Sequence, residues 1–339
     1  MAAAHLVAMK QHSVAIIGAG VAGLTAARQL AATQRITLFD KSRGPGGRLA
    51  NRRRAGYIFD FGAQFFTARD PRFVAEVASL RAAGVVEPWR CRFAEIEDGE
   101  VVARRMWGDE HAHFVALERM SALAAHWAEG LDIRYSTLIT SLRQDSTCWL
   151  LESEEGEIFG PFDFVILALP AAQAAALLPD ASPLWARAST AAMLGCYALM
   201  LGLNAPIDLS FDAALVRCGV LSWLSVSQSR PGHQGLPSLV ALSSNVWAEN
   251  HMEDPSDQVI QAMREELERF VNQPLQAVHV DLHRWRYANC PASQDITPAL
   301  DASLRLAICG DWLHHGRVEA AYLTGYDIAF EVMAVFGAG

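Results

Sequence analysis

The stretch Ser13-Val-Ala-Ile-Ile-Gly18-Ala-Gly20-Val-Ala-Gly23 decides the fold of this chain. Its apolar residues 14–17 predict a buried parallel strand, and its glycines, spaced as G-x-G-x-x-G, predict a turn into a helix over 21–32. A second strand is expected over 36–39, and it ends at Asp40. This order of strand, glycine turn, helix, strand and terminal acid is typical of a dinucleotide-binding unit.

Each residue of the turn has a physical role in that unit. Gly18 permits the tight turn, Gly20 lets the backbone approach a pyrophosphate, and Gly23 lets the helix lie close to the strand. The helix N-terminus favours the anion. Asp40 stands where an acid accepts hydrogen bonds from ribose hydroxyls. An ordinary strand–turn–helix is the alternative, because glycine turns alone are common.

A glycine-rich loop follows the second strand, with the sequence Lys41-Ser-Arg43-Gly44-Pro-Gly46-Gly47-Arg48. Glycines and cations at this place suit a diphosphate longer than one helix end can hold alone. The loop therefore favours FAD over NAD as the resident cofactor.

Composition excludes several classes of protein. The 339 residues can bury a large core as one domain or two interleaved ones, and 52% hydrophobic residues indicate a folded globule. A net charge of −9, with Arg52-Arg53-Arg54 as the one basic run, argues against nucleic-acid binding. The 6 cysteines show no C-x-x-C spacing, which is typical of reduced thiols. The apolar stretches are too short, or broken by Pro170, to span a membrane, so a cytoplasmic location is expected.

Downstream patterns alternate between sheet and helix. A strand-like run is expected over 59–66, and Asp70-Pro71 is expected to begin a helix with Phe73, Val74, Val77 and Leu80 on its core face. Val278, Val280 and Leu282 alternate with polar residues, as in a strand with one buried face. Further strands are expected within 85–115, in an antiparallel meander over 133–162, and over 164–170, 196–203, 220–226, 239–244 and 306–309; further helices are expected near 120–127, after 255 and from 316 to about 335.

The predicted fold class is α/β, or α+β overall: a Rossmann-type FAD-binding domain with an interleaved antiparallel-sheet substrate domain. The FAD-binding domain is expected to comprise 13–70, about 131–180 and 300–339. The substrate domain is expected to comprise about 71–130 and 181–299, and 1–12 an N-terminal tail without a signal peptide.

The return to the nucleotide domain near Gly310-Asp311 is the second informative stretch. A helix beginning near Gly316 could direct its partial positive charge at the electron-rich edge of a reduced flavin. Asp311 could contact the ribityl chain or orient a water at the pyrophosphate. An ordinary strand–loop–helix is the alternative.

Four stretches carry a resemblance to a known family: 39–48 (FDKSRGPGGR), 60–70 (DFGAQFFTARD), 283–288 (HRWRYA), and 309–312 with 316–319 (CGDW and GRVE). They resemble bacterial renalases, a branch of the FAD-dependent amine oxidase superfamily. The resemblance is dense over 13–75 and 280–326 and thinner between. It implies an amine-oxidase-like fold, non-covalent FAD, and oxidation of NAD(P) dihydro-isomers reduced at ring position 2 or 6, with oxygen giving hydrogen peroxide.

The motifs and the resemblance together predict the site residues. The residues expected to position substrate and flavin are Trp285, Tyr287, Gln64 and Phe65, with core packing as the alternative for the aromatic ones. The residues expected to contact FAD are Gly18, Gly20, Val21, Ala22, Gly23, Asp40, Lys41, Arg43, Gly47, Arg48, Gly62, Ala63, Gln64, Gly310, Asp311, Arg317, Val318 and Glu319. No metal is expected, and the partners are a small-molecule substrate and oxygen; the oligomeric state stays open.

A dihydropyridine can expel hydride with help from its own ring nitrogen, so catalysis would consist mostly of positioning. The leading rival is a true amine oxidase or a desaturase, and many such enzymes place a lysine near the flavin. The only lysines here are Lys10, in the tail, and Lys41, beside Asp40. A flavin hydroxylase would require a reducing nicotinamide and a different loop after Gly310-Asp311, so the remaining alternative is a non-enzymatic FAD-binding protein.

Three other features have two interpretations each. His314-His315 could bind substrate or be solvated, and the Arg52 to Arg54 run could neutralise phosphates or form a solvated turn. Cys309 is expected to be a buried strand residue rather than a covalent flavin link.

Overall fold

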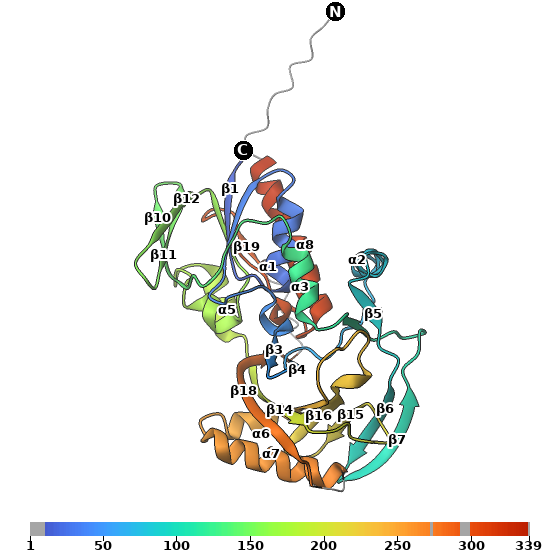
Figure 1. Cartoon of the computed structure of the whole chain (residues 1–339). Coiled ribbons are helices and arrows are strands. Elements are labelled where there is room, and N and C mark those ends of the chain that lie inside the picture. The colour runs from blue at the N-terminus through green and yellow to red at the C-terminus, as the bar shows by residue number, and fades with distance from the viewer. Residues whose placement is uncertain (1–10, 272–273, 292–298, 338–339) are drawn as a thin grey trace, which may run out of the picture.

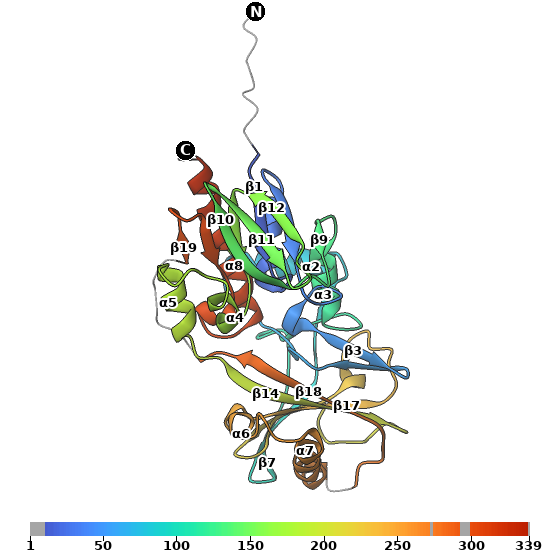
Figure 2. The same cartoon turned by 90° about the vertical axis from the view of Figure 1, so that its left-hand side faces the viewer.

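The computed structural model describes residues 11–271, 274–291 and 299–337. Two bodies are each built around one large sheet (Figure 1). The hairpin of β3 (Asn51–Arg54) and β4 (Tyr57–Asp60) lies between them, as the view turned by 90° also shows (Figure 2). Residues 1–10 of the predicted N-terminal tail, Lys10 included, lie outside the described residues.

The first body contains a six-stranded sheet that is parallel except at one edge pair. From edge to edge its strands are β19 (Leu300–Asp301), β20 (Leu306–Ile308), β13 (Phe164–Leu167), β1 (Ser13–Ile17), β2 (Arg35–Phe39) and β9 (Ile133–Arg134). The expected return of the chain to the parallel sheet is confirmed, because β13 pairs with both β1 and β20. Successive residues of β1 are buried on opposite faces, which explains why its sequence is continuously apolar.

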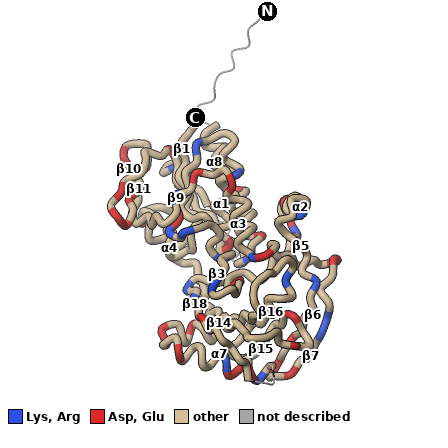
Figure 3. The backbone as a smooth tube through the Cα atoms, in the orientation of Figure 1, with Lys and Arg blue, Asp and Glu red and all other residues tan. Residues whose placement is uncertain are grey.

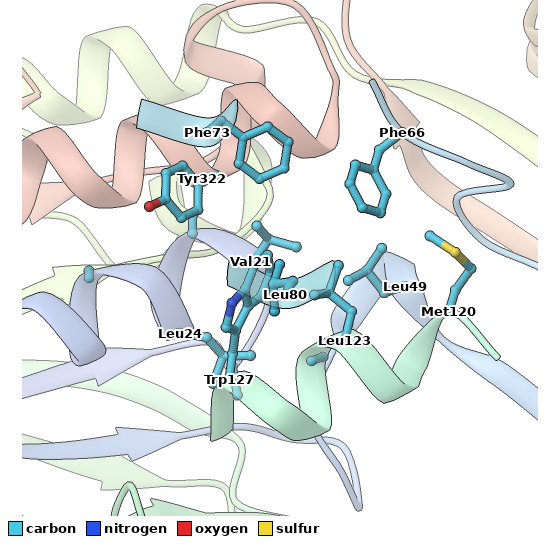
Figure 4. Close-up of a cluster of buried hydrophobic side chains, with 14 of the residues drawn as sticks. Val21, Leu24, Leu49, Phe66, Phe73, Leu80, Met120, Leu123, Trp127 and Tyr322 are labelled. Carbon is cyan, nitrogen blue, oxygen red and sulfur yellow. The ribbon is translucent and has the colours of Figure 1, made fainter. Parts of the chain in front are cut away.

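One face of this sheet is covered by helices. Val14 and Ile16 of β1 contact a core formed with α1 (Val21–Leu30), α3 (Ser121–Ala128) and α8 (Val318–Gly337). Figure 4 shows part of this core, where side chains of these helices and of α2 (Pro71–Ala82) meet around Trp127. The helix α8 crosses α1 closely, since a Cβ atom on Gly325 would lie 2.2 Å from the carbonyl oxygen of Ala22.

The other face of the sheet is covered by the expected antiparallel meander. Its strands are β10 (Ile139–Asp145), β11 (Cys148–Ser153) and β12 (Ile158–Phe162). Ala15 and Ile17 of β1 are buried against it, together with Trp149 and Leu151. The first body is therefore a three-layer arrangement of helices, parallel sheet and antiparallel meander.

The second body contains a seven-stranded sheet with a single parallel pair, β15 with β6. From edge to edge its strands are β18 (Ala277–Asn289), β14 (Leu194–Leu203), β17 (Ser238–Ser243), β16 (Leu221–Val226), β15 (Ala213–Arg217), β6 (Arg92–Glu97) and β7 (Glu100–Met106). The helices α6 (Asn245–Asn250) and α7 (Ser256–Val271) cover one face. On the other face, Tyr57, Phe59 and Phe61 contact Ala198 and Met200.

The remaining elements connect these layers: β5 (Val86–Pro88), β8 (Phe114–Ala116), α4 (Ala171–Ala175), α5 (Pro183–Thr190) and three short 3-10 turns at Gly47–Leu49, Ser227–Ser229 and Asp311–Leu313. The predicted domain boundaries stay a prediction. Within them, α3 was assigned to the substrate domain, and it packs against α1 of the first body.

Three local expectations were wrong. The helix α1 ends at Leu30 rather than Ala32, and Val74 of α2 is 45% exposed. The run 59–66 is not one strand: β4 ends at Asp60, and the Gln64 side chain then bonds to carbonyl groups of its own segment.

The strand β18 is longer than expected, and of its predicted apolar face only Leu282 packs against the core of the second body, whereas Val278 and Val280 are exposed. Val278 is 65% exposed, whereas the ring of His279 stacks on Tyr57 and Phe59. The reason is that the face of β18 that carries His279 lies against the β3–β4 hairpin. The aromatic rings of this hairpin stack with polar side chains such as His279 as well as with apolar ones. Apolar alternation alone could not identify that neighbour.

Acidic and basic residues are interspersed over both bodies (Figure 3). Among the described helices, none combines the length and the apolar character needed to cross a membrane.

Candidate active site

The glycine turn after β1 has the geometry that each glycine was predicted to provide. Gly18 has φ +109°, and a Cβ atom on Gly23 would lie 1.9 Å from the carbonyl oxygen of Gly18. A Cβ atom on Gly20 would meet nothing within 4 Å. Gly18 and Gly23 are thus required by the fold, whereas Gly20 leaves open space at the N-terminus of α1.

The second glycine loop lies against this turn. The N–H group of Gly46 donates to the carbonyl oxygen of Ala19 at 2.9 Å, and a Cβ atom on Gly47 would lie 3.6 Å from the Cα atom of Gly20. Asp40 joins the two loops, because its carboxylate accepts from the N–H groups of Ala19 and Ser42, each at 2.7 Å. The neighbouring Lys41 and Arg43 are exposed.

Arg48 connects the glycine loop with the far end of the sheet. Its guanidinium forms a two-point ion pair with the buried carboxylate of Asp311, with one N–O distance of 2.8 Å. The same group donates to the carbonyl oxygen of Ala288, at the end of β18, at 3.2 Å. Two residues predicted to contact the cofactor, 263 positions apart, are thereby in direct contact with each other.

The loop after β4 is held on Arg48 as well. A Cβ atom on Gly62 would lie 2.0 Å from the carbonyl oxygen of Arg48, and the N–H group of Ala63 donates to that oxygen at 2.9 Å. The buried Gln64 side chain donates to the carbonyl oxygen of Asp60 at 2.6 Å and accepts from the hydroxyl of Ser225 at 2.9 Å. The side chain of Gln64 is therefore fixed by the protein itself.

A buried ion pair stabilises this loop. Arg230 lies 3.5 Å from the carboxylate of Asp60, and it donates to the carbonyl oxygen of Gln64 through both terminal nitrogens. Burial raises the pKa of Asp60, an effect opposed by Arg230 and by the N–H group of Met120, and burial lowers the pKa of Arg230. Nothing local in the sequence marks Arg230, and sequence reasoning missed it.

The alternation with arginines predicted that Trp285 and Tyr287 share one face of β18, and Trp285 lies on the face toward Phe61. Its indole N–H donates to the carbonyl oxygen of Phe61 at 2.9 Å, and the two rings stack at 5.3 Å. Tyr287 follows two positions later, half-buried, beside the carbonyl group that Arg48 binds. On the opposite face, Arg286 pairs with Glu253.

Phe65 is surrounded by aromatic residues that sequence reasoning did not single out. Its ring lies 4.9 Å from Trp107, 5.0 Å from His113 and 5.4 Å from Trp223. These residues come from the end of β7, the loop before β8, and β16. The only sequence signal is the number of tryptophans, 9, which does not say which of them meet.

The C-terminal motif divides between support and exposure. Gly310 donates its N–H to the hydroxyl of Thr324 at 3.1 Å, and Val318 begins α8. The buried carboxylate of Glu319 accepts from the N–H groups of Arg69 and Asp70, so its side chain fixes the start of α2. Arg317, His314 and His315 are exposed.

Two further sequence interpretations can be compared with the geometry. Cys309 is buried, and its burial raises the pKa of the thiol to about 12, which suits an inert core residue. Arg52 is half-buried and pairs with Asp281 at 2.7 Å, while Arg53 and Arg54 are exposed. The described residues contain no group of three or more His, Cys, Asp or Glu able to hold a metal ion.

The arrangement fits a dinucleotide such as FAD. Gly20 is the N-cap of α1 and offers no side chain to the first N–H groups of the helix, and no acidic residue lies in the first turn. Those N–H groups and the open space beside Gly20 suit a pyrophosphate. Asp40 keeps carboxylate oxygens at the end of β2, the place for ribose hydroxyls.

Comparison with known proteins agrees with this fit. The family described as flavin containing amine oxidoreductase matches residues 90–333, and the NAD(P)-binding Rossmann-like domain matches residues 16–78. A 50-residue segment is 44% identical to 4,4'-diapophytoene desaturase (4,4'-diaponeurosporene-forming) of Staphylococcus haemolyticus; it covers 14% of this chain and 10% of the desaturase.

Solved structures share the fold over nearly the whole chain. A protein of Exiguobacterium sp. 255-15, provisionally assigned as a protoporphyrinogen oxidase, has a TM-score of 0.77 at 11% identity and covers 98% of this chain and 100% of its own. Putrescine oxidase bound to putrescine has a TM-score of 0.71 at 13% identity and covers 96% and 99%. At such identities the likeness shows the fold alone, and the predicted roles of individual site residues stay predictions.

Proposed function

This chain belongs to the family of flavin-containing amine oxidoreductases, and we propose that its substrates within that family are dihydronicotinamide dinucleotides reduced at position 2 or 6 of the ring. The chain is an FAD-dependent oxidoreductase of the amine oxidase and desaturase type, with its dinucleotide-binding domain at 16–78. The substrate is the part that we propose.

The observation that carries the proposal is the position of the lysines. The described residues contain one lysine, Lys41, which is exposed and follows Asp40 in the glycine loop. Because Asp40 is the predicted acceptor for the ribose hydroxyls, Lys41 would lie beside the nucleotide part of the cofactor, away from the reacting ring. A substrate that needs no proton removed fits such a site better than an amine does, because no described lysine is expected near the reacting ring.

The flavin supplies a two-electron acceptor that oxygen can reoxidise, so the balanced reaction converts the dihydro-isomer, oxygen and one proton into NAD(P)+ and hydrogen peroxide. The protein's contribution is to position the substrate ring and to exclude water. Trp285 suits this role because its ring is fixed at two points, by its N–H bond and its stacking on Phe61. Gln64 and Arg230 fix the loop after β4 through buried hydrogen bonds.

A second candidate is a flavin amine oxidase or desaturase acting on another small organic substrate. The family match itself favours it, since the family is described by amine oxidation. The two candidates differ in the compound that reduces the flavin.

Anaerobic mixing of the holoenzyme with single compounds separates them. We expect 2- or 6-dihydro-NAD(P) to bleach the visible flavin absorbance, whereas putrescine, benzylamine and ordinary 4-dihydro-NADH leave it unchanged. The ordinary isomer carries its hydride on a different ring carbon, so one binding pose cannot bring both carbons to the acceptor. Bleaching by an amine, with the dihydro-isomers inert, would replace the proposal by the second candidate.

A further inference from the structure

The strand β18 contains a bulge at residues 286–288, beside the residues predicted to position the substrate. Its register with β14 shifts between Trp285 and Asn289, so that residues 286–288 have a single residue of β14, Gly195, opposite them. Bulges of this kind are over-represented next to active sites, where they redirect a side chain. The middle residue of the bulge is Tyr287.

The backbone of the bulge is bonded outside the sheet. The N–H group of Gly195 donates to the carboxylate of Glu249, and its carbonyl oxygen accepts from the side chain of Asn245 at 2.7 Å, so both of its backbone groups bond to α6. The carbonyl oxygen of Ala288, at the end of the bulge, accepts from the guanidinium of Arg48 at 3.2 Å. An arginine of the second glycine loop thus bonds the bulge in place of a strand neighbour.

The position of the Tyr287 ring depends on this backbone. In the described part of the chain, the Tyr287 side chain takes part in no hydrogen bond and no aromatic stacking. Trp285 differs, because its ring is fixed by a hydrogen bond and by stacking on Phe61. The half-buried ring of Tyr287 therefore lies where the bulge places it.

Arg48 is itself fixed. Its guanidinium forms the two-point ion pair with Asp311, whose side chain is 6% exposed. A two-point pair between a guanidinium and a carboxylate has a defined geometry as well as strength. The first body, which carries both partners of the pair, therefore determines where the carbonyl group of Ala288 lies.

We propose that Arg48 is a positioning residue for the substrate: it holds the bulge of β18 so that the Tyr287 ring aligns the substrate ring with the flavin. The inference rests on the proposed function, in which catalysis consists mostly of positioning. It gives Arg48 a role besides its predicted contact with FAD, and neither the motifs nor the family match assign that role.

Amide hydrogen exchange on the holoenzyme tests the first step. Arg48→Lys keeps a positive charge beside Asp311, but an ammonium group cannot reproduce the planar fork that reaches the carboxylate and Ala288 together. We expect the amides of 286–289 to exchange about 5-fold faster in this variant, as for the loss of one hydrogen bond. The segment 280–283, which pairs with β14 in regular register, should exchange as in the wild type.

Arg286→Lys is the matched control. Arg286 lies within the same bulge, but its side chain is 48% exposed and pairs with Glu253, which is 73% exposed. Exposed ion pairs of this kind contribute little to stability. The control should therefore change neither the exchange of 286–289 nor the rate of flavin reduction.

Anaerobic flavin reduction at saturating 6-dihydro-NAD(P), with FAD fully bound, tests the second step. We expect Arg48→Lys to lower the limiting rate about 10-fold or more, since a misplacement of about 1 Å can cost about 100-fold. In a Tyr287→Ala background the same substitution should have little further effect, because the ring through which Arg48 acts is absent. A role of Arg48 in FAD binding alone would weaken FAD in both backgrounds and leave the limiting rate of the loaded enzyme unchanged.

The outcomes separate this inference from the proposed function. Unchanged exchange over 286–289, or equal slowing by Arg48→Lys with and without Tyr287, overturns the positioning role even if the dihydro-isomers reduce the flavin. If an amine reduces the flavin and the dihydro-isomers do not, the rates are measured with that amine, and only the proposed reaction fails. If Arg48→Lys does not retain FAD, the two apoproteins are compared, and the same faster exchange is expected.

Discussion

Replacement of Gly20 by alanine should separate cofactor binding from folding. The backbone at Gly20 has φ −80° and ψ −176°, which alanine adopts without strain, and the added Cβ atom would meet nothing within 4 Å. A glycine-to-alanine change at such a position typically stabilises a protein by about 0.4–1 kcal/mol, through the unfolded chain. The apoprotein of Gly20→Ala should therefore be at least as stable as the wild type.

The same methyl group occupies the space where the pyrophosphate should approach the N–H groups of α1. Loss of one charge-assisted hydrogen bond there costs about 1.5–3 kcal/mol, so FAD should bind roughly 10- to 150-fold more weakly. Denaturant unfolding of the apoprotein measures the first quantity, and fluorescence titration with FAD measures the second.

Gly23→Ala is the matched control on the same turn. Its Cβ atom would lie 1.9 Å from the carbonyl oxygen of Gly18. Ordinary overpacking lowers the free energy of unfolding by about 1–3 kcal/mol, and this variant should lose more than that. The reasoning is refuted if Gly20→Ala binds FAD as tightly as the wild type, or if its apoprotein is destabilised as much as that of Gly23→Ala.

The other predictions concern three charged or titrating groups. Asp40→Ala removes the carboxylate that joins the two glycine loops, and equilibrium titration should show FAD bound about 1.5–3 kcal/mol more weakly, with unchanged affinity arguing against its role. Arg230→Met leaves Asp60 buried without its cation and should lower the free energy of unfolding by about 3–5 kcal/mol, of which Asp60→Asn in the same chain should restore a part; a near-neutral single variant would contradict the buried pair. Burial and Arg52 lower the pKa of His283 from its ordinary value of 6.5 to about 4. As the pH falls, this histidine is therefore protonated in the unfolded chain at a higher pH than in the folded protein. The contribution of His283 to the free energy of unfolding should therefore be complete above pH 6.5 and be lost as the pH falls from 6.5 to about 4. His283→Gln should flatten that part of the pH dependence in denaturant titrations.

The nucleotide-binding half of the fold could be predicted because its constraints are local. The turn from β1 to α1 is decided by residues within a few positions of each other, and the glycine contacts at Gly18 and Gly23 confirm it. The same is true of α2, where Asp70 accepts from the N–H group of Arg72 and Pro71 occupies the first helical position. Such signals survive in the sequence because cap and turn chemistry acts over one helical turn.

The substrate side could not be predicted in the same way, because its contacts join distant parts of the chain. The Gln64 side chain bonds to Ser225, 161 positions away, and Arg230 is buried against the same loop from 166 positions away. The strand β15 was also missed. It pairs with β16, which follows it closely in the sequence, and with β6, which lies more than a hundred residues before it. No local pattern shows that Trp107 and Trp223, from distant parts of the chain, both lie against Phe65.

The proposed reaction is tested most directly by the electron donor that reduces the flavin in the absence of oxygen. Stopped-flow mixing of the holoenzyme with a stoichiometric amount of 6-dihydro-NAD(P), and separately of the 2-dihydro-isomer, follows the visible flavin absorbance. We expect complete bleaching by at least one isomer, recovery of the absorbance when oxygen is admitted, and one hydrogen peroxide formed per NAD(P)+. Retention of the full absorbance with both isomers, while putrescine or another amine bleaches it, would contradict the proposal.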